Sequence, residues 1–249
     1  MSDRPPFSKV LDRVADVEGW MTDDQARRLF DRCIELGPGT TVVEIGSFRG
    51  RSAIVLACAA RPGVELVAID PHGGGDRGPR EIAPDQALGD DDHAAFNSNL
   101  AAAGMADRVR HIRKTSEAAL QDVEGEIDLL YIDGAHRLGP ARADIVNWGA
   151  RVSGGGTMLI HDSFSSIGVT LALFTTTFGS GSWAYVGRSQ SMAEFARVNL
   201  GRSERITNAV RQALQLPWFL RNVVIKFLLT VKLAPLTRLL GHRTDDWPY

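Results

Sequence analysis

From residue 41 onward, short apolar runs rich in β-branched residues alternate with stretches of helical periodicity, and this alternation constrains the fold more than any other feature. The apolar runs cover residues 41–45, 64–69, 109–112, 127–132 and 157–160, and the helical patterns cover residues 52–60, 93–103, 115–120 and 140–150. Parallel strands need a crossover connection and are buried on both faces, so their sequences are almost continuously apolar. The alternation therefore predicts an α/β fold with a mostly parallel sheet and helices on both faces.

Two terminal segments and a hairpin complete the predicted organisation. Residues 183–186 and 192–195 are apolar runs joined by a short polar connection, which predicts a hairpin that closes the sheet with an antiparallel strand. We expect N-terminal helices over residues 1–40, a central domain over residues 41–200 and a basic, apolar helical arm over residues 201–249.

The composition excludes several classes of protein. With 44% hydrophobic and 23% charged residues, the chain has the composition of a folded globular protein rather than a disordered one. The net charge of −2 gives no reason to expect a nucleic-acid partner. The only cysteines, Cys33 and Cys58, lie in apolar, helix-like runs, so we expect no disulfide framework and a cytoplasmic location. The charged N-terminal residues also lack the apolar core of an export signal.

A glycine-containing turn follows the first apolar run. Gly46 and Gly50 lie between that run and the next helical pattern, where a ligand can approach the backbone and the helix offers free N–H groups. The spacing is neither the dinucleotide-binding Gly-x-Gly-x-x-Gly nor a P-loop. Glu44 is expected to be a buried carboxylate that needs a partner or a cationic ligand. Asp70 ends the second run, where an acid can accept hydrogen bonds from ribose hydroxyls. The alternative is a tight turn with an ion-paired glutamate and no ligand.

These residues resemble the first two motifs of the class I S-adenosylmethionine-dependent methyltransferases. Further blocks between residues 41 and 165 are similar to the methyltransferase family-24 type, in the expected order. They are Asp70-Pro-His72, Phe96-x-x-Asn99-Leu100, Gly104, Asp107-Arg-Val109, Thr115-Ser-Glu-Ala118, the run from Ile127 to His136, Gly154-Gly-Gly156 and His161-Asp-Ser163. The resemblance implies a Rossmann-like methyltransferase sheet and S-adenosylmethionine as the cofactor. The cofactor-binding residues that it implies are Glu44, Gly46, Ser47, Gly50, Ser52, Asp70, Thr115, Ser116 and Asp133.

Thr115 and Ser116 follow the third predicted strand. The resemblance implies that they lie near the adenine of the cofactor, with the neighbouring backbone reading its edge. The alternative is a helix N-cap, in which either hydroxyl accepts a hydrogen bond from the first turn of the pattern at residues 115–120. Both roles can hold together.

Acids and histidines follow two neighbouring predicted strands. Asp133 and His136 follow the fourth strand, and His161 and Asp162 follow the fifth. Because a ligand binds outside the carboxyl ends of strands in an open parallel sheet, these side chains should converge. Paired carboxylates repel, share a proton or hold a hard cation, so we expect Asp133 and Asp162 to bind Mg²⁺, which would lower the pKa of a substrate hydroxyl. Similar metal-dependent O-methyltransferases of catechols and macrolide sugars place acids here, but the sugar-modifying relatives tend to have two adjacent acids where this chain has His161-Asp162.

His136 and His161 are the candidates for a general base. If strand geometry persists, His161 and Asp162 face opposite ways and only one of them enters the site. Since Asp162 is the better metal ligand, His136 is the expected base. An ordinary polar contact remains the alternative role for each histidine.

A long glycine-rich connection over residues 71–92 is expected to form an active-site lid. Its last acids, at residues 90–92, could suggest a metal site, but they directly precede a helical pattern and suit the first turn of that helix. His72, Arg77 and Arg80 in this connection are expected to contact the substrate.

The C-terminal arm is basic as well as apolar. Arginine and lysine outnumber acids by eight to three in residues 201–249, for a net charge of +5. The pattern at residues 206–214 is amphipathic, and the pattern after Pro217 is apolar almost all round but carries Arg221, Lys226, Lys232 and Arg238. The arm is therefore a poor spanning segment and a fair interfacial one. A homodimer contact, a peripheral membrane contact and packing on its own domain all remain open.

Together these features predict a Mg²⁺-assisted, S-adenosylmethionine-dependent O-methyltransferase. The resemblance implies a small-molecule hydroxyl substrate, such as a saccharide, glycoconjugate or glycolipid, although the residues do not identify it. A metal-independent phenol or polyketide O-methyltransferase with a histidine base is the first alternative. A catalytically silent nucleoside-binding or membrane-associated scaffold is the second.

Overall fold

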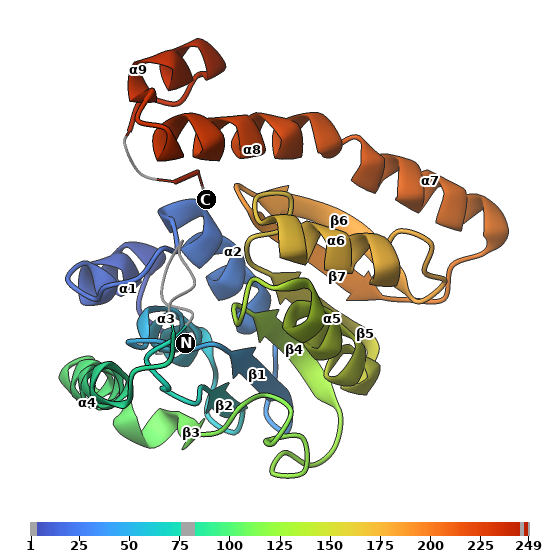
Figure 1. Cartoon of the computed structure of the whole chain (residues 1–249). Helices are drawn as coiled ribbons and strands as arrows, with labels where there is room; N and C mark the ends of the chain where they lie inside the picture. Colours follow the sequence, from blue (N-terminus) through green and yellow to red (C-terminus); the bar gives the residue numbers. More distant parts are fainter. Residues whose placement is uncertain (1–3, 76–82, 245–246, 249) are drawn as a thin grey trace.

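The computed structural model describes residues 4–75, 83–244 and 247–248 (Figure 1). A seven-stranded sheet has the order β3-β2-β1-β4-β5-β7-β6. Its strands are β1 (Thr41–Ile45), β2 (Glu65–Ile69), β3 (Arg110–Ile112), β4 (Ile127–Ile132), β5 (Val152–Ile160), β6 (Trp183–Ser189) and β7 (Met192–Arg197). β1 to β5 are parallel, and β7 runs antiparallel to both β5 and β6. The predicted Rossmann-like sheet with an antiparallel closing strand is confirmed.

Helices cover both faces of this sheet (Figure 1). One buried cluster joins the sheet to α1 (Phe7–Val14), α2 (Asp23–Ile34), α3 (Arg51–Ala59) and α4 (Gln86–Ala102). The other joins it to α5 (Leu138–Asn147) and α6 (Ile167–Thr176). The arm contains α7 (Arg202–Ala213), α8 (Leu216–Thr230) and the short α9 (Ala234–Thr237). Single 3₁₀ turns are η1 (Ala106–Arg108), η2 (Gly149–Arg151) and η3 (Arg238–Leu240).

Helix α4 begins seven residues before the predicted start at residue 93. Asp85 is its N-cap, and the Asp85 carboxylate accepts hydrogen bonds from the backbone N–H groups of Ala87 and Leu88. The prediction that the acids at residues 90–92 lie in the first helical turn is therefore wrong. Asp90 and Asp92 instead form ion pairs with Arg113 and Arg49.

Two other predicted elements differ from the structure. Residues 115–120 form turns rather than a helix, although the Thr115 hydroxyl still accepts a hydrogen bond from the Ala118 N–H at 3.3 Å. Helix α6 was not predicted, because its serine-, threonine- and glycine-rich surroundings obscure the helical pattern. Within the described residues, no helix has both the length and the apolarity needed to cross a membrane.

Candidate active site

A cavity of about 680 Å³ lies outside the carboxyl ends of β1, β2, β4 and β5. This is the position at which open α/β sheets bind ligands, and the volume suits a small molecule or nucleoside cofactor. The structure brings several predicted site residues to the cavity wall: Gly46, Asp70, Thr115, Ser116, Asp133, His136, His161 and Asp162. Glu44, Ser47, Gly50 and Ser52 belong to the strand, turn and helix directly behind that wall. His72 also lines the cavity, whereas Arg77 and Arg80 lie outside the described residues.

The two glycines of the first turn are required by backbone geometry. Gly46 has φ +85°, and a Cβ at that position would lie 2.1 Å from the carbonyl oxygen of Asp133. Gly50 has φ +88° and is the N-cap residue of α3. The structural reason for Gly46 is therefore the close approach of the β1 and β4 ends, rather than the ligand approach that the sequence suggested. The two glycines therefore fix the backbone of the turn that lies beside the cavity.

Glu44 is a buried carboxylate at the end of β1, with 1% of the residue exposed. Neither of its carboxyl oxygens forms a hydrogen bond within the described part of the chain, and the nearby Ser47 hydroxyl is equally unpaired. Burial, together with the negative charges of Asp133 and Asp70, raises the pKa of Glu44 to about 8, even though the nearby Ser52 and Ser47 hydroxyls act to lower it. A cationic ligand, such as the ammonium group of an amino acid, would stabilise the ionised form of this buried carboxyl group.

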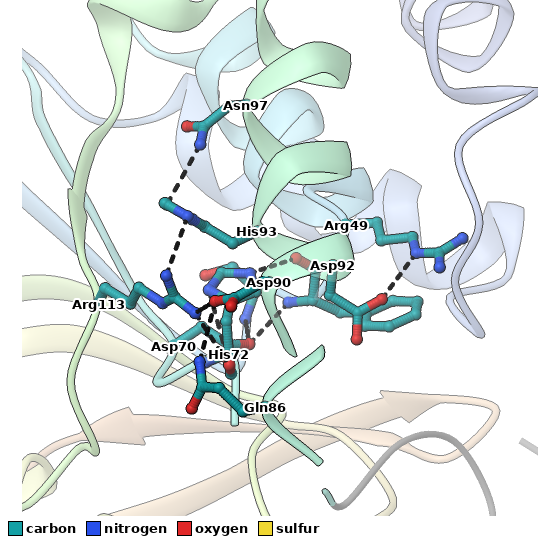
Figure 2. A network of polar contacts seen from close by, with 11 residues as sticks. Arg49, Asp70, His72, Gln86, Asp90, Asp92, His93, Asn97 and Arg113 are labelled. Carbon is teal, nitrogen blue, oxygen red and sulfur yellow. Dashed lines mark hydrogen bonds and ion pairs between the residues drawn. The ribbon is translucent and has the colours of Figure 1, made fainter. Parts of the chain in front are cut away.

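Asp70 organises the same turn from the end of β2 (Figure 2). Its Oδ2 accepts hydrogen bonds from the backbone N–H groups of Ser47 at 2.9 Å and Phe48 at 2.8 Å, and its Oδ1 accepts one from the N–H of His72 at 2.7 Å. The His72 ring closes the turn through a 2.8 Å contact between its Nε2 and the Phe48 carbonyl. A carboxylate has about four lone-pair positions, so Asp70 keeps the capacity to accept a hydroxyl from the cavity.

The region around Ser116 contains an acid that the sequence analysis missed. The Ser116 hydroxyl donates a hydrogen bond to Asp144 Oδ1, and the Trp148 indole N–H donates to the Ser116 carbonyl at 3.2 Å. Asp144 lines the cavity and is 5% exposed, and burial raises its pKa to about 6. In the sequence, Asp144 is one acid within the helical pattern at residues 140–150, and no motif marks it as a site residue.

Two histidines and two acids form an ion-paired cluster where β4 and β5 end. His136 Nε2 lies 2.8 Å from Asp162 Oδ2. His161 Nδ1 lies 3.1 Å from Asp162 Oδ2 and 3.2 Å from Asp133 Oδ1. The Tyr131 hydroxyl donates to Asp133 Oδ2 at 2.8 Å. The predicted convergence of acids and histidines at this edge is therefore seen.

Both His161 and Asp162 reach this cluster, so the expectation that only one of them enters the site is wrong. The reason is local backbone geometry. β5 ends at Ile160, and Asp162 has φ +56°, which breaks the alternation of side chains along the strand. The left-handed residue directs the Asp162 carboxylate toward both histidines.

The charges within the cluster stabilise one another. Burial alone would lower the pKa of His161, but Asp133 and Asp162 outweigh it and raise the pKa to about 9. His161 Nε2 faces Gln25 Oε1 at 3.3 Å, so both ring nitrogens have acceptors and the imidazolium form is favoured. Although burial opposes it, the two histidines hold the pKa of Asp162 well below its usual range. Burial would also lower the pKa of His136, yet Asp162 leaves it raised.

The cluster also has the donor set of a metal site. One ligand atom each from Asp133, His136 and Asp162 can be chosen so that all three lie within 4.8 Å of one another. Two carboxylates and an imidazole fit a divalent cation, although Mg²⁺ prefers oxygen ligands and seldom takes an imidazole. Binding a cation here would compete with the contact between His136 and Asp162.

Several cavity residues gave no sequence signal. Trp20, in the connection between α1 and α2, packs against Phe48 with ring centroids 5.1 Å apart, and both side chains line the cavity. Gln25 reaches His161 from α2, where it also forms a capping box with the N-cap residue Thr22. Contacts of this kind join segments far apart in the chain, so periodicity and spacing do not reveal them.

Comparisons with known proteins agree with this geometry. A family model described as a methyltransferase domain matches residues 43–163. An O-methyltransferase from Bacillus cereus in complex with SAH has 16% identity and a TM-score of 0.57 over 78% of this chain and 90% of that chain. The O-methyltransferase TomG from Streptomyces achromogenes, in complex with SAM, has 17% identity and a TM-score of 0.53 over 78% of this chain and 89% of that one.

A third similar structure, the SAH-bound methyltransferase PaMTH1 from Podospora anserina, has 19% identity and a TM-score of 0.56 over 80% of this chain and 90% of that chain. At these identities the structures establish a shared fold. The family match runs from within β1 to the turn after β5 and includes the described cavity-lining residues other than Trp20. Residues 43–163 therefore match a methyltransferase domain, and the chain shares the fold of these SAM- and SAH-bound O-methyltransferases.

Proposed function

We propose that this protein transfers the methyl group of S-adenosylmethionine to a hydroxyl oxygen of a small polar molecule. The observation that carries the proposal is one cavity that combines two kinds of group. The buried carboxylate of Glu44 lies behind its wall, and the ion-paired cluster of His136, His161, Asp133 and Asp162 lines it. A carboxylate for a cationic cofactor beside an acid–base cluster is the arrangement that this reaction requires.

Four groups of residues would hold the cofactor. Glu44, with Ser47 and Ser52 beside it, would accept the ammonium group, and Gly46 and Gly50 would shape the turn around it. Asp70 would accept the ribose hydroxyls, and Thr115 and Ser116 would lie at the adenine. Asp133 would contribute negative charge close to the cationic cofactor. When bound, the sulfonium supplies an activated methyl group and a good leaving group.

His136 is the proposed base. Its Nε2 is held by Asp162, whereas its Nδ1 forms no hydrogen bond within the described residues. Asp162 thus fixes the ring orientation and leaves Nδ1 to accept the proton of a substrate hydroxyl. His161, held between two carboxylates and Gln25, would act as a fixed positive charge that keeps Asp133 and Asp162 in place. His161 would therefore position the two carboxylates and would not accept the proton of the substrate hydroxyl.

A divalent cation, with Mg²⁺ as the first candidate, would be held by the carboxylates of Asp133 and Asp162. It would supply Lewis acidity that lowers the pKa of the substrate hydroxyl. His136 lies close enough to be either a third ligand or the base, and it cannot do both at once. The metal-independent mechanism is the second candidate, because both carboxylates are already paired with histidines.

A saccharide, glycoconjugate or glycolipid is the proposed acceptor class, on the resemblance to sugar-modifying O-methyltransferases alone. The test is transfer of labelled methyl groups to panels of sugars, glycosides and phenols, with Mg²⁺ or with excess chelator. Turnover that chelation abolishes and Mg²⁺ restores supports the metal-assisted mechanism. Full turnover in chelator supports the histidine mechanism. Absence of turnover in every panel, in a protein that binds the cofactor, would favour the catalytically silent alternative.

A further inference from the structure

Helices α7 and α8 turn several amides inward and many apolar side chains outward, although α8 also buries Ile225 and packs Trp218 and Phe219 on the core. The buried positions include the amides Asn208, Gln212 and Asn222. The exposed apolar side chains, called here the outer stripe, are Ile206 (68% exposed), Val210 (53%), Leu214 (69%), Leu220 (63%), Val224 (38%), Phe227 (63%) and Val231 (43%). An amphipathic helix of a water-exposed surface normally shows the opposite pattern.

The inward amides attach the arm to its own domain. Asn208 accepts a hydrogen bond from the Tyr185 N–H at 2.7 Å and donates to the Trp183 carbonyl at 2.9 Å, so it caps the outer edge of β6. Gln212 exchanges hydrogen bonds with Thr177 at the end of α6. On α8, Asn222 donates to the Phe164 carbonyl at 3.3 Å, just beyond Asp162. These specific contacts fix which face of each helix points outward.

The outer stripe lies along one face of each helix. Its members recur every three or four residues within each helix, which places them on one face. Figure 1 shows α7 and α8 running nearly end to end along one side of the molecule, with α9 beyond them. Leu233, Leu236 and Leu239 extend the exposed apolar surface to that end. An apolar patch of this length marks an interaction surface rather than scattered surface residues.

The charge of the same segment indicates what covers it. From Arg205 to Thr244 the sequence contains no aspartate or glutamate, and it contains the bases Arg205, Arg211, Arg221, Lys226, Lys232, Arg238 and Arg243. All of these except Arg221 and Lys226 are exposed, although Arg205 and Arg211 also donate to the Gly179 and Val186 carbonyls of the domain. A second copy of the chain docked on this face would bring bases mainly against bases, because Glu204 at the start of α7 is the one acid in the described part of α7, α8 and α9. An anionic surface with an apolar interior matches both the charge and the stripe.

We propose that the outer stripe docks the protein onto anionic lipid bilayers, with α7 and α8 lying in the interface and the methyltransferase domain on the water side. Apolar side chains would enter the headgroup region, and the exposed bases would contact lipid phosphates. The inference depends on the arm alone and does not require the proposed methyl acceptor.

The test is flotation of the full-length protein with vesicles of phosphatidylcholine alone or mixed with phosphatidylglycerol, at low and high salt. Two variants probe the surface: Phe227→Asp places a charge in the stripe, and Lys232→Glu reverses an exposed base. Val146→Asp on α5 is the control, because Val146 is also an exposed apolar residue (43% exposed) but lies outside the arm. Circular dichroism and light scattering establish that each variant is folded and report its oligomeric state.

The proposal predicts binding to the anionic vesicles only, weakened by high salt. It predicts at least tenfold weaker binding for Phe227→Asp, at least fivefold weaker binding for Lys232→Glu, and unchanged binding for Val146→Asp. No vesicle binding, equal binding to neutral vesicles, or equal loss in the control would overturn it. A wild-type dimer that Phe227→Asp converts to a monomer, with no vesicle binding by either, would assign the stripe to a second copy instead.

Discussion

The imidazole of His136 and the carboxylate of Asp162 lie 2.8 Å apart, and this contact joins the segment after β4 to the segment after β5. Neither residue is near the other in the sequence. Their approach results from the adjacency of the two strands and from the left-handed backbone at Asp162. The pair orients the histidine that the proposed mechanism uses as its base.

Replacing His136 should therefore reduce turnover far more than binding. We expect His136→Gln to lower kcat by about 100- to 10,000-fold, the usual contribution of a positioned general base, with the affinity for S-adenosylmethionine nearly unchanged. Steady-state kinetics and calorimetry on the same preparation measure both quantities. His242→Gln, a histidine of the arm, should behave like the wild type. Equal losses in kcat and in cofactor affinity would mean that His136 acts by holding the cofactor.

Asp70 should be important for cofactor affinity. Asp70→Asn removes the negative charge that accepts three backbone N–H groups and faces the cavity. We expect S-adenosylmethionine binding to weaken by about 1.5–3 kcal/mol, the usual range for hydrogen bonds to a charged group. Asp90→Asn is the control, because the exposed Asp90 carboxylate contacts Arg113 and Gln86 and does not line the cavity. Unchanged affinity in Asp70→Asn would show that β2 does not contact the cofactor.

Asp144 should make the stability of the ligand-free protein depend on pH. Its pKa is raised from 3.8 to about 6 in the folded state, so the folded protein holds a proton that the unfolded chain has already released. Stability is therefore lost as the pH rises from about 4 to about 6, by roughly 3 kcal/mol at most. Asp144→Asn keeps an acceptor for Ser116 and removes this dependence.

Denaturant unfolding at pH 4, 5, 6 and 7 measures the effect as the difference between wild type and Asp144→Asn. The variant should gain stability relative to the wild type as the pH rises to 6, and the difference should then remain constant. A difference that does not change with pH would mean that Asp144 ionises normally in the folded protein.

The mostly parallel sheet and the cavity position could be predicted because they follow from strong local signals. Continuous apolar runs identified the parallel strands. Because ligands bind beyond the carboxyl ends of such strands, the sequence also predicted that Asp133, His136 and Asp162 converge. The glycines of the first turn were also identified, but the physical reason differed. Gly46 is required by the Asp133 carbonyl, a contact between two strands that spacing alone does not reveal.

The features that could not be predicted depend on tertiary contacts or on one unusual backbone angle. Asp85 begins α4 ahead of the apolar pattern, because a side-chain cap outweighs periodicity at that end. Gln25 contacts His161 across 136 positions of sequence. The inward-facing amides of α7 and α8 reverse the usual relation between polarity and exposure, so the amphipathic pattern of the arm did not indicate which face packs on the domain.

Glu44 allows the most direct test of the cofactor site. Its carboxyl has a pKa of about 8 in the ligand-free protein, so it carries a proton at lower pH, whereas binding an ammonium group requires the ionised form. Cofactor binding below pH 8 should then release a proton, and affinity should rise by about tenfold from pH 6 to pH 7 and by about fivefold from pH 7 to pH 8. Glu44→Gln should abolish this dependence, and the exposed Glu124→Gln should preserve it.

The decisive measurement is calorimetric titration of the ligand-free protein with S-adenosylmethionine at pH 6, 7 and 8, in two buffers of different ionisation enthalpy. The predicted result is one site per chain, an affinity that increases with pH, and a heat of binding below pH 8 that differs between the buffers because Glu44 releases its proton. Absence of binding, or binding whose affinity and heat are independent of pH and buffer in the wild type, would contradict the assignment of this cavity and of Glu44 to the cofactor.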